Sequence, residues 1–335
     1  MDCSNTGAFQ MNRYARQEIL PEIGAEGQAK LRKAHVLVVG AGGLGCPALQ
    51  YLAGAGIGRI TLVDPDKVDR SNLHRQPLYG ESSIGQPKAQ AAREALRDLN
   101  PETEITPIVA ALDPANAERL VAQADIAMDC ADSFAASYIL SDTCHALGKP
   151  LISASVLGLS GYVGGFCGGA PSMRAVFPDL PKTLATCATA GVLGPVVGTF
   201  GALQAQMVLA ALLGLEPSPL GNMVSVDLKR FSFRSFRFDN APEPERIPFP
   251  FIAPASLRHD DLLVELRGME EAPQSLRGDA MRASVDQFRE ESIVPPEGRR
   301  VVMCCRSGLR AWRAASALKR YWPGEIALIA AGDAG

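Results

Sequence analysis

The clearest pattern along the chain is a series of short apolar runs that end in glycine or aspartate and lead into helical spacing. Residues 35–45 (HVLVVGAGGLG) begin as an apolar run, and RITLVD ends at Asp64. A further run ends in MDCADS, which contains Asp129 and Asp132. Uninterrupted apolar runs of this length are typical of parallel strands that are buried on both faces. The pattern predicts an α/β fold with a doubly wound, Rossmann-like, mostly parallel sheet.

The pattern changes after residue 240, where APEPERIPFPFIAP is rich in proline and has little apolar periodicity. This composition predicts a linker over residues 241–254, between an N-terminal domain of residues 1–240 and a C-terminal domain of residues 255–335. In the C-terminal domain, LLVELR, GRRVVMCC and EIALIAAG predict strands, and SGLRAWRAASALKRYW predicts an amphipathic helix. We therefore expect a second, small α/β unit.

Composition and charge narrow the possible partners. The net charge of −3 and the sequence pI near 5.9 argue against a nucleic-acid partner. No N-terminal stretch has the order of a signal peptide, so we expect a cytoplasmic protein. The longest apolar region, residues 190–215, is rich in glycine and contains Gln204 and Gln206. We interpret it as a buried or dimer-forming helix, because a membrane span needs a longer uninterrupted run.

The glycines after the first apolar run predict a nucleotide site. Gly40, Gly42 and Gly45 have the spacing of a tight turn that brings a phosphate to a helix N-terminus. Asp64 follows at about the distance at which a carboxylate meets a ribose hydroxyl in such folds. These features alone fit NAD and ATP equally.

Three separated cations favour ATP: Arg16 in RYARQ, Arg75 in SNLHRQ and Lys88 in GQPK. An NAD diphosphate is commonly held by backbone amides. A triphosphate attacked at its α-phosphorus needs several fixed cations to stabilise the charge that develops. Each cation taken singly could be an ordinary surface residue, but the set favours ATP chemistry.

The order of these motifs resembles the MoeB, ThiF and HesA group of adenylating enzymes over roughly residues 13–235. The matching motifs are RYARQ, GAGGLG, LVDPDKVDRSNLHRQ, GQPKA, MDCADS and TCATAGVLGPVVG. The resemblance implies ATP-dependent adenylation of the C-terminal glycine of a ubiquitin-like sulfur carrier protein. It places Gly43 and its loop against the nucleotide and Asp64 on the ribose. It places Asn72, Arg75 and Lys88 on the phosphates.

The resemblance makes Asp132 the ligand of the magnesium ion that accompanies ATP. Asp129 is the competing candidate, and we rank it lower because it lies within an apolar run and could orient the loop instead. By the same resemblance, Arg16 reaches across a dimer interface into the partner's nucleotide site, so a homodimer is expected.

The cysteines depart from the family in one respect. Many MoeB-type enzymes hold a structural zinc with two CxxC pairs. Here APSMRAVFP places Ser172 and Ala175 at the first pair, and FRFDNAPEPE has no cysteine at the second. We predict no zinc and a corner held by packing alone. Cys187, in a Thr-rich segment where the family carries a cysteine on a mobile loop, is a candidate to attack the acyl-adenylate or to form an acyl disulfide.

The C-terminal domain contains CRSGLR, residues 305–310, between a predicted strand and a predicted helix. Loop amides, the helix N-terminus and the two arginines would stabilise a thiolate or persulfide on Cys305. The segment resembles the active-site loop of rhodanese-type sulfurtransferases, formed here by Cys305, Arg306, Ser307, Gly308 and Arg310. The usual segment before it is replaced by SLRGDAMRAS. Period-two alternation turns Cys304 to the other side of the strand.

Together the two halves predict adenylation of a carrier protein ending in Gly-Gly, followed by sulfur transfer from Cys305 to give a thiocarboxylate. The sulfur would come from thiosulfate or a cysteine desulfurase. The alternatives are an NAD-dependent oxidoreductase, a nonenzymatic scaffold of a sulfur-relay complex and, for the C-terminal loop, a phosphatase or an inactive module.

Overall fold

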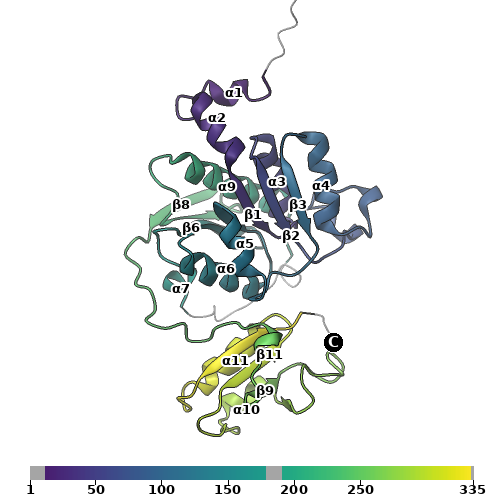
Figure 1. Cartoon of the computed structure of the whole chain (residues 1–335), viewed down its shortest axis with the longest axis vertical. Coiled ribbons are helices and arrows are strands. Elements are labelled where there is room, and N and C mark those ends of the chain that lie inside the picture. The colour runs from purple at the N-terminus through teal and green to yellow at the C-terminus, as the bar shows by residue number, and fades with distance from the viewer. Residues whose placement is uncertain (1–11, 179–190, 333–335) are drawn as a thin grey trace, which may run out of the picture.

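The computed structural model describes residues 12–178 and 191–332, and its main feature is an eight-stranded sheet with a smaller four-stranded sheet below it (Figure 1). The order in the large sheet is β3-β2-β1-β4-β5-β6-β7-β8. Strands β3 to β5 are parallel, and β6 to β8 are antiparallel to their neighbours. This confirms the predicted doubly wound, mostly parallel α/β sheet. The strands are β1 His35–Val39, β2 Arg59–Val63, β3 Glu104–Ile108, β4 Ile126–Asp129, β5 Pro150–Leu157, β6 Ser160–Cys167, β7 Asn222–Asp227 and β8 Ser232–Arg237.

Helices cover both faces of this sheet. One face packs against α2 Gly24–Lys33, α3 Gly45–Gly54, α4 Lys88–Leu99 and α9 Gly194–Leu213. The other packs against α5 Ala117–Gln123, α6 Phe134–Ala146 and α7 Met173–Val176. The apolar run of β1 serves both cores, because Val36 and Val38 point to one face and Leu37 and Val39 to the other. The short helix α1, Ala15–Glu18, precedes α2.

The apolar region around residues 190–215 forms α9. Among the described residues, α9 alone is long and apolar enough to cross a membrane, with a mean hydropathy of 1.7. One side packs on α3, β5 and β6, and Phe200 is fully buried there. The buried Gln204 donates from Nε2 to the carbonyl oxygen of Asp129 at 2.6 Å. Leu203 and Leu209, on its outward side, are half-buried.

The C-terminal unit has four parallel strands in the order β10-β9-β11-β12. Its elements are β9 Leu262–Glu265, β10 Met281–Arg282, α10 Val285–Arg289, β11 Val301–Cys305, α11 Leu309–Leu318 and β12 Ile326–Ala330. The proline-rich segment joins this sheet. The N–H of Ile252 donates to the carbonyl of Leu328, and the N–H of Leu328 donates to the carbonyl of Pro250, both at 2.9 Å. The side chains of Phe249 and Phe251 are buried.

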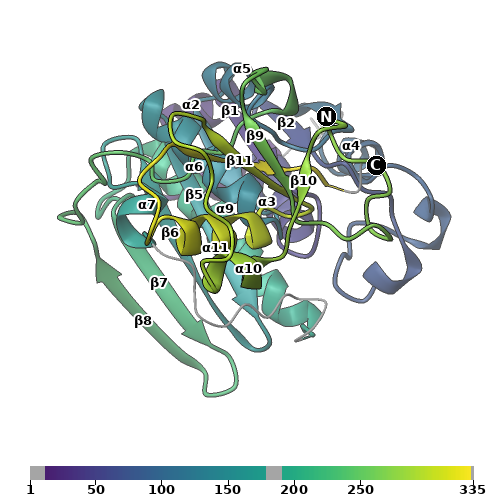
Figure 2. The same cartoon turned by 90° about the horizontal axis from the view of Figure 1, so that it is seen from below.

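The two units share one buried apolar cluster, which runs from α5 and α6 through Phe249 and Phe251 into α11 and β11. In the view from below, the C-terminal unit lies in front of the large sheet, while β7 and β8 extend to one side (Figure 2). The C-terminal unit therefore sits at the carboxyl end of the parallel strands, beside the N-terminal turn of α6.

Candidate nucleotide site and thiol loop

The turn after β1 is built from glycines that approach the backbone closely. Gly40 has φ of +99°, and a Cβ there would lie 2.6 Å from the carbonyl oxygen of Cys130. A Cβ on Gly45 would collide with the carbonyl oxygen of Gly40. The turn thus closes over the junction between β1 and β4, where the strand order reverses. Gly42 and Gly43 are half-buried on this turn, directly before α3, so backbone amides are available to an anion.

Asp64 directly follows β2 and is held against the glycine turn. Its carboxylate accepts the N–H of Ala41 at 2.7 Å and the N–H of Asp66 at 2.8 Å, and the residue is 4% exposed. Burial raises the pKa of this carboxyl, while the Ala41 N–H and the charge of Lys88 oppose that shift. The structure thus places Asp64 beside the turn at the carboxyl end of the sheet, where ligands of such sheets bind.

Lys88 opens α4, and its buried ammonium donates to Asp66 at 2.8 Å. The segment that carries it is fastened to the glycine turn by Tyr79. The buried Tyr79 hydroxyl donates to the carbonyl of Ala41 at 2.9 Å and lies 3.3 Å from the carbonyl of Lys88. Lys88 and Asp64 therefore flank the same turn from two elements.

Arg75 and Asn72 lie on the segment between β2 and α4. The Arg75 guanidinium donates to the carbonyl of Ser71 at 3.1 Å and lies 2.9 Å from Nε2 of His74. Both Arg75 and Asn72 are half-buried. The N-terminus of α9 supports this segment, because a Cβ on Gly194 would lie 3.4 Å from Cα of Arg75.

The two aspartates after the third apolar run have different environments. Asp129 is 1% exposed and accepts the hydroxyl of Ser153 at 2.8 Å and the N–H of Ala131 at 3.1 Å. Burial raises the pKa of Asp129. Asp132 is exposed and has no hydrogen bond or ion pair to another described residue. Asp129 orients the loop, and Asp132 presents a carboxylate at its surface.

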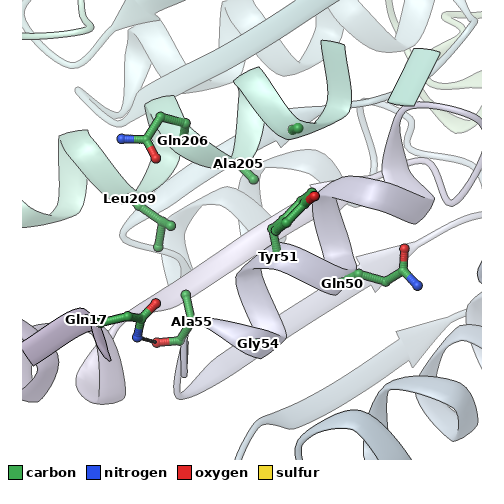
Figure 3. Close-up of a pocket in the computed structure, with 9 residues that line it drawn as sticks. Gln17, Gln50, Tyr51, Gly54, Ala55, Ala205, Gln206 and Leu209 are labelled. Carbon is green, nitrogen blue, oxygen red and sulfur yellow. Dashed lines mark hydrogen bonds between the residues drawn. The ribbon is translucent and has the colours of Figure 1, made fainter. Parts of the chain in front are cut away.

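Arg16 is not brought to the other cations of its own chain. It is exposed on α1, at the end of the molecule opposite the C-terminal unit (Figure 1). A groove of about 430 Å³ lies beside it, between α1, α3 and α9 (Figure 3). Its lining includes Gln17, Tyr51 and Leu209. Tyr51 is 59% exposed there.

The thiol loop, residues 305–310, joins the end of β11 to the start of α11. Its first residue, Cys305, lies close to the N-terminus of α11. The N–H of Ala311 donates to Sγ of Cys305 at 3.3 Å. Cys305 is fully buried, while Arg306 and Ser307 are exposed. The predicted alternation is confirmed, because Cys304 and Cys305 belong to apolar clusters on opposite faces of the small sheet. Burial raises the pKa of Cys304 to about 12.

Arg310 is oriented by an acidic residue that lies far from it in the sequence. Its guanidinium donates to both carboxylate oxygens of Glu271, one at 2.8 Å, and to the carbonyl of Leu266 at 3.1 Å. This hydrogen bonding holds the pKa of Glu271 below its usual range. Arg310 is thereby fixed beside the loop.

The region around Ser172, where the sequence predicts no zinc, is held together by hydrogen bonds. Glu243 accepts both the N–H and the hydroxyl of Ser172, at 2.6 and 2.7 Å. The Ser172 hydroxyl in turn accepts the N–H groups of Arg174 and Ala175 and caps α7. The prediction that packing alone holds this corner is therefore wrong. Within residues 12–178 and 191–332, no group of three or more His, Cys, Asp or Glu side chains is placed so that it could hold a metal ion.

Several site residues escaped the sequence analysis, and one predicted residue lies outside the structure described. Tyr79, Glu271 and Glu243 act through partners far away in the chain, and no motif marks them. Cys187 lies outside the described residues.

Comparisons with known proteins agree with the geometry of the N-terminal unit. Residues 14–246 match the ThiF family. The Bos taurus protein named adenylyltransferase and sulfurtransferase MOCS3 is 48% identical over 231 residues, which are 68% of this chain and 51% of that protein. The Aspergillus fumigatus protein named adenylyltransferase and sulfurtransferase uba4 is 49% identical over 222 residues, 63% of this chain and 45% of that protein. The chain spans about half the length of the curated relatives it matches.

Two solved structures share the fold over about 70% of this chain. The crystal structure of E. coli MccB with MccA-N7isoASN has a TM-score of 0.62 and 25% identity, and the match covers 70% of this chain and 75% of that one. The crystal structure of E. coli MccB with ATP has a TM-score of 0.62 and 24% identity, with 72% and 76% covered.

Proposed function

This chain belongs to the ThiF family, and on that premise we propose that it adenylates the C-terminal glycine of a ubiquitin-like sulfur carrier protein and then delivers sulfur to it. The observation that carries the proposal is the convergence of four features at one sheet edge. These are the glycine turn, the buried Asp64, the cations Arg75 and Lys88, and the exposed Asp132.

In the adenylation step, the carrier carboxylate attacks the α-phosphorus of ATP and pyrophosphate leaves. Asp64 would bind the ribose, and the amides of the turn around Gly43 would face the phosphates. Asn72, Arg75 and Lys88 would stabilise the charge on the phosphate oxygens as the bond to pyrophosphate breaks. Lys88 would exchange its present partner, Asp66, for phosphate oxygens. Asp66 is largely exposed, so its carboxylate would be solvated by water after the exchange.

Magnesium fits the donor set at this edge. Mg²⁺ is commonly bound by one or two carboxylates together with substrate phosphates and water, and Asp132 offers such a carboxylate. The ion would neutralise part of the triphosphate charge. Asp129 would hold the loop through Ala131 and Ser153.

In the sulfur step, the terminal sulfur of a Cys305 persulfide would attack the acyl carbon and displace AMP, leaving an acyl disulfide on Cys305. A second thiolate would then attack the Cys305 sulfur, release the thiocarboxylate and form a disulfide with Cys305. Cys187 is our candidate for this thiol, and a dithiol reductant would return both cysteines to thiols. Thiosulfate or a cysteine desulfurase would reload Cys305.

A homodimer would complete the nucleotide site. Arg16 lies far from the other cations of its own chain, and the face beside it carries the exposed apolar side chains Ile19, Leu20 and Tyr51. Pairing of this face with a second copy would bury them and bring Arg16 to the partner's triphosphate.

The test is intact-mass spectrometry of Gly-Gly carrier proteins incubated with the enzyme, ATP, magnesium and thiosulfate. Replacement of one oxygen by sulfur on a carrier supports both steps, and an adenylate without sulfur supports the first alone. Lys88→Met should stop adenylation, Asp132→Asn should lower its rate strongly, and Cys305→Ala should stop only sulfur transfer. Binding of NADH in place of magnesium-ATP, with no change on any carrier, would instead favour an oxidoreductase.

A further inference from the structure

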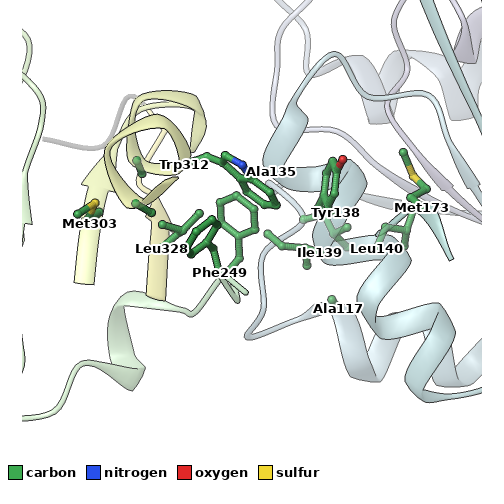
Figure 4. Packing of buried hydrophobic residues seen from close by; sticks show 14 of the residues in the cluster. Ala117, Ala135, Tyr138, Ile139, Leu140, Met173, Phe249, Met303, Trp312 and Leu328 are labelled. Carbon is green, nitrogen blue, oxygen red and sulfur yellow. The ribbon is translucent and has the colours of Figure 1, made fainter. Parts of the chain in front are cut away.

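The two units meet in a seam that consists of Phe134, Tyr138, Arg174, Phe249 and Trp312. Trp312, on α11, is 2% exposed, and Figure 4 shows it facing Ala135 and Tyr138 on α6. Its ring centroid lies 5.2 Å from that of Phe134, and 5.3 Å from those of Tyr138 and Phe249. The rings are tilted or perpendicular, which is the favourable geometry for aromatic pairs.

Arg174 joins the aromatic rings to the N-terminal unit. Its Cζ lies 5.1 Å from the ring centroid of Tyr138 and 5.2 Å from that of Trp312. Its Nε and Nη2 donate to the two carboxylate oxygens of Asp142 at 2.6 and 2.8 Å. Arg174 is 3% exposed, and a buried guanidinium is tolerated only where it is paired. Trp312 supplies one wall of its environment.

The seam places the thiol loop against the first turn of α6. Gly308 has φ of +81°, and a Cβ there would lie 2.6 Å from the ring of Phe251 and 3.1 Å from Cβ of Ala135. Ala135 lies in the first turn of α6, whose N-cap Ser133 directly follows Asp132. The helix that begins beside the candidate magnesium ligand, α6, is therefore also the helix that the thiol loop contacts.

The linker keeps the C-terminal unit with its own chain. Ser172 binds Glu243 at the start of the linker, and Nη2 of Arg174 donates to the carbonyl of Phe249 at 3.4 Å. The chain between these two anchors can span at most about 20 Å even when it is fully extended. While Ser172 holds Glu243, Phe249 therefore stays within about 20 Å of the N-terminus of α7 even when the seam is open.

We propose that Trp312 is a positioning residue that docks the Cys305 loop at the nucleotide site of its own chain, and that the seam opens when sulfur is loaded. Cys305 is fully buried in the docked arrangement, so the loop must shift before sulfur is loaded on Sγ and again when that sulfur meets the acyl group. The inference rests on the proposed function for its chemistry and on the seam for its geometry.

The first experiment compares Trp312→Ala and Ala135→Leu with the full-length wild type. In Ala135→Leu, the larger side chain on α6 should push the thiol loop away, while the sequence of the C-terminal unit stays unchanged. We expect carrier-dependent ATP–pyrophosphate exchange within twofold of wild type, and thiosulfate-to-cyanide sulfur transfer at least as fast as in wild type. Thiocarboxylate formation should fall at least tenfold and be restored by Trp312→Phe. Equal loss of all three activities, or unchanged thiocarboxylate formation, would overturn the proposal.

A second experiment tests whether Cys305 delivers sulfur to the nucleotide site of its own chain or to that of another chain. Lys88→Met cannot adenylate under the proposed function, and Cys305→Ala cannot carry a persulfide. A coexpressed mixture of the two variants should form no thiocarboxylate above the background of either alone. Product in the mixture would show delivery between chains and refute the own-chain assignment.

A third experiment tests the seam without measuring any enzymatic activity. Cys305 in the wild type, Trp312→Ala and Ala135→Leu is alkylated with iodoacetamide, and the Cys305 peptide is followed by mass spectrometry. We expect at least tenfold faster alkylation in both variants, and equal rates would refute a seam that covers the thiol. If the wild type forms no adenylate, the proposed function fails while this experiment still decides the seam.

Discussion

Ser172 donates both its backbone N–H and its hydroxyl to the carboxylate of Glu243, at 2.6 and 2.7 Å. The pair joins the N-terminus of α7 to the segment that leads into the C-terminal unit. Because Ser172 is buried, loss of its partner would leave two donors without an acceptor.

Glu243→Gln should therefore destabilise the N-terminal unit by about 1–2 kcal/mol, since the amide offers one acceptor oxygen in place of two. Urea unfolding followed by circular dichroism measures the change. Glu245→Gln removes the same charge from an exposed position two residues away and is the control. Equal unfolding curves for the two variants would contradict the assignment.

Two nearby substitutions in the glycine turn should have different effects on the stability of the fold. Gly40→Ala combines a positive φ with a Cβ 2.6 Å from a carbonyl oxygen, so we expect a loss of about 2 kcal/mol or more of stability. Gly42→Ala places its Cβ 3.7 Å from the amide of Gln76 in ordinary contact, so the fold should be unchanged. Thermal unfolding measures the first effect. The second should appear only as weaker ATP binding in a titration, and a destabilised Gly42→Ala would show that the turn is packed differently.

The aspartates after β4 should separate stability from catalysis. Asp132→Asn changes an exposed carboxylate, so we expect normal unfolding and a loss of about 100-fold in adenylation, the size typical of lost transition-state electrostatics. Ser153→Ala removes a hydroxyl donor from the buried Asp129 and should cost about 1–3 kcal/mol of stability. Pyrophosphate exchange at several magnesium concentrations and urea unfolding measure the two effects. Restoration of Asp132→Asn by raised magnesium would identify a metal-affinity defect, while normal activity would remove Asp132 from the site.

The ion pair between Arg310 and Glu271 predicts a pH dependence in the C-terminal unit. The guanidinium lowers the pKa of Glu271, so the folded state favours the ionised carboxylate. The resulting stability is present above the ordinary glutamate pKa and is lost as the pH falls through the lowered pKa of the folded state. Because both side chains are about one-third exposed, we expect only about 0.5 kcal/mol at pH 7.

Glu271→Gln tests this pH dependence, with the exposed neighbour Glu270→Gln as control. Both tryptophans of the chain, Trp312 and Trp322, lie in the C-terminal unit, so tryptophan emission during urea unfolding reports on this unit. The difference between the two variants should be largest at pH 7 and should shrink as the pH falls through the acid range. A difference that does not change with pH would point to packing instead of charge.

The sequence predicts those parts of the fold that have local causes. The apolar run of β1, the glycines after it, and the alternation of Cys304 and Cys305 all follow from neighbouring residues. By contrast, Arg174 and Trp312 become neighbours only through the docking of two units. Glu243 meets Ser172 although α7, α9, β7 and β8 lie between them in the sequence. Such pairs have no local pattern, so neither the seam nor the hydrogen bonds between Ser172 and Glu243 could be predicted.

The pairing of Phe251 with Leu328 determines where the chain can be cut. Residues 250–252 shield the outer side of β12, whose residues 326–329 are all apolar and buried. A fragment that begins at residue 255, the boundary indicated by composition, would leave this strand as an uncovered apolar edge, a common starting point for aggregation. A fragment that begins before Phe249 would retain its own cover, so the soluble yield of the separate C-terminal unit should depend on a handful of residues that composition assigns to the linker.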